Sequence, residues 1–247
     1  MSIVEEYNLA LRLYNEGKLD TAKKGFLFCL SLQNDFFNAQ FMLGNIYLQQ
    51  KKYKQAIKAY KEAIKLNPSY TPTYNNIANI YTILQKKEKV LKYLNLGLKQ
   101  NKKCTNTLYN LANYFKNSLN LKKSKQCLKK LLKIDAQHAL AHFDLSYIYF
   151  IEKKYKKAFN HFEYRMKISR EQSKYKYLPF KHLENQPIKE TKLLLYHEQG
   201  FGDNIQFIRF LNNEKLKNTQ ISYAVQNPLN RLFSYSFPKI NFQVKLL

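Results

Sequence analysis

The sequence predicts an α-helical repeat solenoid followed by a partial α/β lobe built on a parallel sheet. Three observations support this fold class. Small and large side chains recur every 34 residues from Ile3 to about Gln172. The chain of 247 residues holds only six Gly and six Pro, which argues against an all-β fold. Beyond residue 190 the pattern changes to short apolar runs that alternate with helical segments.

The clearest repeat begins at Phe37 and reads FNAQFMLGNIYLQQKKYKQAIKAYKEAIKLNPSY. Counted from its first residue, Gly44 and Ala56 hold the eighth and twentieth places, where the missing bulk lets two helices cross closely. Pro68 at the thirty-second place ends the second helix. This segment closely resembles the tetratricopeptide repeat (TPR), whose unit is a pair of helices.

Steps of 34 residues predict five such repeats without an insertion, at 3–36, 37–70, 71–104, 105–138 and 139–172. The eighth place is always small, as Ala10, Gly44, Ala78, Ala112 and Ser146. The twentieth place departs from alanine in the third and fourth repeats, which hold Val90 and Ser124 there. Because the pattern of small and large residues at the helix-packing positions persists in all five repeats, one continuous stack over residues 1–172 is expected. Five repeats exceed the roughly three that a stable solenoid needs.

The groove of this stack is the expected binding site. Its inner places hold polar side chains, namely Asn45, Asn76, Asn79, Asn110 and Asn113, with Tyr147 at one end. A carboxamide offers both a donor and an acceptor, so such a row matches the N–H and C=O groups of an extended peptide. The groove of O-linked N-acetylglucosamine transferase is similar. We therefore expect a scaffold that binds an extended protein segment, although an Asn-rich composition would also explain these residues.

A linker with two prolines is predicted at 173–190, and an incomplete lobe at 191–247. Strands are expected at 192–197, 220–226 and 241–247, and helices at 204–211 and 228–234. The order β-α-β-α-β predicts a parallel, Rossmann-like sheet. Its open edge would favour association between chains.

The lobe contains KLLLYHEQGFGDNIQFIRFL, which resembles the segment after the repeats in bacterial TPR proteins with a glycosyltransferase-like domain. That domain is the two-lobed type related to O-linked N-acetylglucosamine transferase and lipopolysaccharide heptosyltransferases. The resemblance implies that Asp203 acts as a base on the acceptor hydroxyl. It implies substrate binding by Glu198, Gln199, Gly200 and Gly202. A structural role explains Asp203 equally well, because Asp203 and Gln206 have the spacing of a capping box at the start of a helix.

Catalysis by the chain alone is not expected. Only 44 residues follow Asp203, and no Gly-rich phosphate loop replaces a donor-binding lobe. The alternative function is therefore part of a glycosyltransferase, which would use a nucleotide-sugar donor only with a separate second lobe. No metal is expected, because His138 and His142 have no third ligand near them in sequence.

The net charge of +25 results from 42 basic and 17 acidic residues, and only five of the basic residues are Arg. The lysines are scattered along the chain, which is rich in residue types that A/T-rich codons encode. This distribution favours a solvated lysine surface over a protein that recognises bases, because base recognition relies on bidentate hydrogen bonds from Arg. No specific nucleic-acid partner is expected, and an RNA- or membrane-surface-binding protein is the third interpretation. No signal peptide, transmembrane run or cysteine pairing motif is visible, so a cytoplasmic location is expected.

Overall fold

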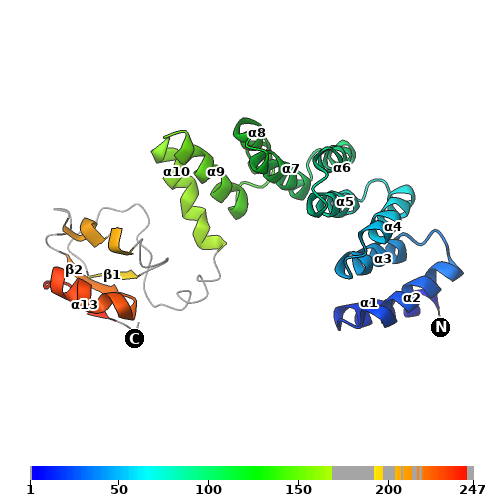
Figure 1. The fold of residues 1–247 in the computed structure, drawn as a ribbon, viewed down its shortest axis with the longest axis horizontal. Coiled ribbons are helices and arrows are strands. Elements are labelled where there is room, and N and C mark those ends of the chain that lie inside the picture. The colour runs from blue at the N-terminus through cyan, green and yellow to red at the C-terminus, as the bar shows by residue number, and fades with distance from the viewer. Residues whose placement is uncertain are drawn as a thin grey trace. The chain divides into compact units, whose positions relative to one another are not determined.

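The computed structural model describes residues 2–168, 192–196, 204–206, 208–212, 216 and 219–243. The chain divides into two compact units, with the boundary after Ile168. Figure 1 shows a row of helix pairs in the first unit and a small sheet in the second. Each unit has its own hydrophobic core.

The first unit consists of five helix pairs, which confirms the predicted solenoid. They are α1 (Ile3–Asn15) with α2 (Leu19–Leu32), α3 (Phe37–Gln49) with α4 (Tyr53–Leu66), α5 (Thr71–Ile83) with α6 (Lys87–Gln100), α7 (Thr105–Asn117) with α8 (Leu121–Leu132), and α9 (Ala139–Ile151) with α10 (Tyr155–Phe162). The second helices α2, α4, α6 and α8 each also pack against the first helix of the next pair. The last pair differs from expectation: α10 ends at Phe162, not near Arg170, and continues as the 3-10 helix η1 (Glu163–Lys167).

The helix crossings lie where the repeat pattern places them. The residues of the eighth and twentieth places are buried in every pair, including Gly44 and Ala56. A side-chain carbon on Gly44 would collide with the ring of Tyr60, which is fully buried. Glycine is therefore required here by the close approach of α3 and α4.

The turn inside each pair repeats one backbone conformation. The residue at the fifteenth place has a positive φ in all five repeats: 78° at Gly17, 57° at Lys51, 56° at Gln85, 58° at Leu119 and 57° at Lys153. Only Gly adopts this left-handed conformation without steric cost. Four of the five turns therefore hold a residue that the conformation disfavours.

The second unit contains a parallel sheet in the order β1-β2-β3. The strands are β1 (Lys192–Tyr196), β2 (Gln220–Ala224) and β3 (Asn241–Gln243), close to the predicted positions. The helix α13 (Asn227–Ser236) covers the expected 228–234 segment. At 204–211 the described residues form a short helical turn at 204–206 and the 3-10 helix η2 (Ile208–Asn212) rather than one regular α-helix.

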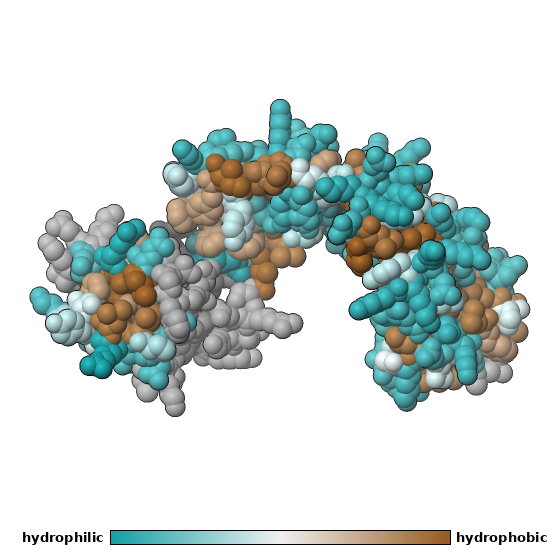
Figure 2. Space-filling view, in the orientation of Figure 1, coloured by the Kyte–Doolittle hydropathy of each residue, from teal (hydrophilic) through white to brown (hydrophobic). Residues whose placement is uncertain are grey.

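Hydrophilic side chains cover most of the visible solenoid surface in Figure 2, with separate hydrophobic patches between them. Among the described residues, no helix has the length and apolar character needed to cross a membrane.

Candidate functional site

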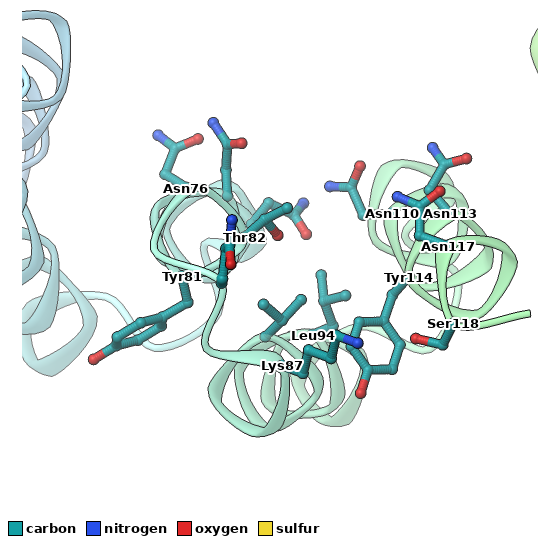
Figure 3. Close-up of a pocket in the computed structure, with 14 residues that line it drawn as sticks. Asn76, Tyr81, Thr82, Lys87, Leu94, Asn110, Asn113, Tyr114, Asn117 and Ser118 are labelled. Atoms are coloured by element: carbon teal, nitrogen blue, oxygen red, sulfur yellow. The ribbon is translucent and has the colours of Figure 1, made fainter.

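The candidate site is a pocket between the first helices of the third and fourth repeats. Its volume is about 520 Å³. α5 and α7 form its walls and contact each other, and Val90 and Leu94 of α6 contribute apolar surface. Its six asparagines are Asn75, Asn76, Asn79, Asn110, Asn113 and Asn117. In Figure 3, Asn110 points from α7 toward α5, and Leu94 lies on the α6 side.

The pocket brings together four of the six residues predicted to contact a peptide: Asn76, Asn79, Asn110 and Asn113. Asn79 and Asn110 are exposed, and Asn113 is half-buried. The lining contains one charged side chain, Lys87, and no carboxylate. A pocket of this kind presents mostly uncharged donors and acceptors above an apolar surface.

Asn45 lies outside the pocket lining and belongs to a hydrogen-bonded group with Tyr60 and Asn76. The Tyr60 hydroxyl donates to Asn45 Oδ1 at 2.6 Å, and Asn76 Nδ2 donates to both of these oxygens at 3.1 Å. Burial raises the pKa of Tyr60 well above its ordinary value, so the phenol stays protonated. This group fixes the orientation of two predicted contact residues from inside the core.

The fifth repeat places a carboxylate where its neighbours have asparagine. Asp144 holds the sixth place, like Asn76 and Asn110, and is 7% exposed. Lys116 Nζ lies 2.6 Å from Asp144 Oδ1. Burial, and next the charge of Asp144, raise the pKa of Tyr109 to about 12. Tyr147 is 51% exposed and packs edge-on against Phe143, and its contact with a peptide stays a prediction.

The residues expected to serve a glycosyltransferase-like site lie outside the described residues. These are Glu198, Gln199, Gly200, Gly202 and Asp203. Nearby described residues include Asn204, which is buried and hydrogen-bonded to the Tyr223 hydroxyl and to Gln226 Oε1. Sequence reasoning missed this group, since a polar residue just inside a helix start gives no signal for a bond to a strand 19 residues away.

Sequence reasoning also missed a histidine pair in the fifth repeat. His142 Nδ1 lies 2.6 Å from His161 Nδ1, and Tyr164 stacks on His142 with the ring centroids 3.5 Å apart. His142 Nε2 is 3.0 Å from the Ala136 carbonyl, which only accepts, so this nitrogen carries the proton in the neutral ring. His142 Nδ1 then accepts from His161. The structure groups no three metal-binding side chains together among the residues it describes.

Comparison with known proteins supports the repeat assignment. Residues 37–70 and 105–138 each match the tetratricopeptide repeat family. No curated protein matches the chain.

Several solved structures share the fold at low sequence identity. MamA is 17% identical with a TM-score of 0.56, over 68% of this chain and 97% of that chain. YrrB, described as a TPR protein with an unusual peptide-binding site, is 18% identical with a TM-score of 0.52, over 68% and 87%. Pseudomonas aeruginosa pilF is 14% identical with a TM-score of 0.61, over 68% and 76%. The first unit of this chain is therefore a solenoid of tetratricopeptide repeats.

Proposed function

We propose that the solenoid is a protein-interaction scaffold that holds an extended segment of a partner protein in the pocket between α5 and α7. One observation carries the proposal: six asparagines from two neighbouring helices line a single pocket with an apolar floor. Asn is a mediocre helix former, so its repetition within α5 and α7 calls for a reason other than helix stability. That YrrB is described as having a peptide-binding site agrees with this class of function.

The expected recognition is of the partner's backbone. Each carboxamide pairs with one peptide N–H or C=O, and apolar side chains of the partner meet Val90, Leu94 and the ring of Tyr114. Such a groove accepts many sequences of modest apolar character. It discriminates against structured segments, whose backbone groups are already hydrogen-bonded.

Backbone chemistry tests this mode directly. Peptides selected from a random display library against the whole chain would be resynthesised with single N-methyl groups, and also with single alanine substitutions. We expect N-methylation at alternate central positions to weaken binding by about 0.5–1.5 kcal/mol for each lost hydrogen bond, and most alanine substitutions to cost less. The reverse ranking would show that the pocket recognises the side chains of the peptide, and it would contradict recognition of the peptide backbone by the asparagines.

Part of a glycosyltransferase is the second candidate function, favoured by the parallel order β1-β2-β3. In this proposal Asp203 is the base and a separate polypeptide supplies the donor-binding lobe. The whole chain would then transfer sugar from a nucleotide donor only when that lobe is added. Loss of the activity in Asp203→Asn, with unchanged folding, would support the role, and full activity of that variant would refute it.

A further inference from the structure

The structure separates charge between the two kinds of helix in the central repeats. The first helices α3 and α5 contain no charged residue, and α7 contains only Lys116. The second helices carry four lysines in α4, four in α6 and five in α8, with two carboxylates among them, Glu62 and Glu88. The thirteen lysines are named here the lysine face: Lys54, Lys58, Lys61, Lys65, Lys87, Lys89, Lys92, Lys99, Lys122, Lys123, Lys125, Lys129 and Lys130.

The lysine face is open to solvent and largely uncompensated. All of its members except Lys125 are exposed. Of the thirteen lysines, only Lys65 and Lys125 pair with a carboxylate of the described part of the chain, Glu62 and Glu152 respectively. On α4 the lysines recur at intervals of four, three and four residues, which sets them in one line about 16 Å long.

Codon composition does not explain this separation. A bias toward A/T-rich codons enriches both Asn and Lys, yet here the asparagines gather in the pocket of α5 and α7 and the lysines on the second helices. Solvation alone does not require lysine on every second helix either, because Ser, Gln and Glu also solvate a helix. The pattern therefore indicates two surfaces with different ligands.

The chemistry of the lysine face favours a phosphate polymer. Protein interfaces are depleted in Lys and rely on exposed aromatic and Arg anchors, and none of the aromatic residues of α4, α6 or α8 is exposed. Helices that lie in a membrane surface insert apolar side chains, and only Leu66 is exposed among the large apolar residues of these three helices. Lysines act on phosphates as point charges that need no particular geometry, which gives sequence-independent affinity for a nucleic acid backbone.

We propose that the lysine face of α4, α6 and α8 binds the phosphate backbone of a nucleic acid duplex without reading its sequence. The face has no Arg to form bidentate contacts with base edges, so the contacts made are of the positioning kind. Lys87 is the one member of the lysine face that also lines the asparagine pocket, and the asparagines of that pocket would remain open to a protein segment. The solenoid would then join a protein to a nucleic acid surface.

Fluorescence anisotropy with two labelled 30-base-pair DNA duplexes of unrelated sequence tests the proposal on the whole chain. The face variant carries Lys58→Glu, Lys92→Glu and Lys122→Glu, one exposed lysine from each helix. The matched control carries Lys192→Glu, Arg231→Glu and Lys239→Glu, which are exposed residues of the second unit. Both variants change the net charge by the same amount, and circular dichroism checks that each keeps the helix content of the wild type.

We expect the wild type to bind both duplexes equally, within about twofold, with an affinity that falls by about 0.9 log units per tenfold rise in salt for each neutralised phosphate. The face variant should bind at least about tenfold more weakly and show a shallower salt slope, while the control changes less than about threefold. Equal weakening of the two variants, no duplex binding by the wild type, or a strong preference for one duplex would overturn the proposal. Binding to phosphatidylserine vesicles without binding to the duplex would assign the face to a membrane surface instead.

Discussion

At the scale of single residues, Tyr60 connects the groove to the core. Its ring fills the crossing beside Gly44, and its hydroxyl bonds to Asn45 and Asn76. The eighth and twenty-fourth places could be predicted from the sequence because the 34-residue period reports packing. The hydroxyl group's partners could not, because Asn45 and Asn76 come from two different repeats and only the stacked fold brings them together.

The substitution Gly44→Ala tests this crossing. The added carbon collides with the buried Tyr60 ring, which is held by its hydrogen bonds, so the helices must separate. We expect a loss of about 1–3 kcal/mol in the free energy of unfolding, measured by urea denaturation. Gly97→Ala is the control, since its new carbon would meet Tyr74 Cβ at 3.3 Å, a contact that needs only a small shift. Equal stability of Gly44→Ala and wild type would contradict the assigned crossing.

At the scale of elements, the turn within each helix pair has a backbone conformation that the sequence does not reveal. Gly17 is the only glycine at the fifteenth place, so a reader of the sequence sees one glycine turn, whereas the structure has five turns of one conformation. Leu119 adopts it while 86% exposed, because the pairing of α7 with α8 fixes the backbone and overrides the preference of the residue. The helix pairs were predictable from the repeat, apart from the end of α10, but the shared turn geometry was not.

Two opposite substitutions test the turn. Gly17→Ala should destabilise the solenoid by about 1 kcal/mol through its positive φ alone, since nothing lies within 4 Å of the added carbon. Leu119→Gly should stabilise it, or cost nothing, because relief of the disfavoured φ offsets the greater freedom of glycine in the unfolded chain. Thermal unfolding of both variants is the measurement. A destabilising Leu119→Gly paired with a neutral Gly17→Ala would contradict the turn assignment.

The fifth repeat should lose stability in mild acid because of its histidine pair. Burial lowers the pKa of His142 and of His161, and for His161 the charges of His142 and Lys129 lower the pKa further. The unfolded chain titrates near its ordinary pKa of about 6.5 and binds protons that the folded pair resists. The free energy of unfolding is therefore highest at pH values well above 6.5, where the rings are neutral in both states, and it decreases as the pH falls through about 6.5.

Urea midpoints measured from pH 7.5 to 5.5 check this dependence. The double variant His142→Gln and His161→Gln removes both titrating rings of the pair, and we expect its midpoint to change less over this range than that of the wild type. The same pH dependence in both proteins would show that the pair does not contribute.

At the scale of the whole molecule, the two units have separate cores and should behave separately. In the solenoid, one buried cluster contains Tyr60, Leu94 and Leu128, and a second contains Phe26 and Ile46. The core of the second unit includes Val225, Leu229 and Phe233. The sequence predicted the parallel strands because their apolar runs are continuous. It did not predict the geometry of a glycosyltransferase-like site, because a turn motif specifies residue types and not the positions of partners distant in sequence.

The sheet edge predicts association through the second unit. β1 and β3 are the outer strands of the sheet that the structure describes, and the outer strand of a sheet favours pairing with a strand of another chain. Sedimentation velocity over a range of concentrations should show reversible association of the whole chain, and a monomer for a chain ending at Ile168. Equal association of the two would place the contact in the solenoid.

The central claim is that the asparagines of α5 and α7 hold a peptide backbone, and calorimetric titration of one selected peptide tests it most directly. The groove variant carries Asn79→Ala, Asn110→Ala and Asn113→Ala, and the control carries Asn38→Ala, Asn95→Ala and Asn106→Ala, which are exposed and outside the pocket. With about 0.5–1.5 kcal/mol for each lost hydrogen bond, the groove variant should bind at least about tenfold more weakly, and the control should match the wild type. Equal affinity of a folded groove variant and the wild type would contradict the claim.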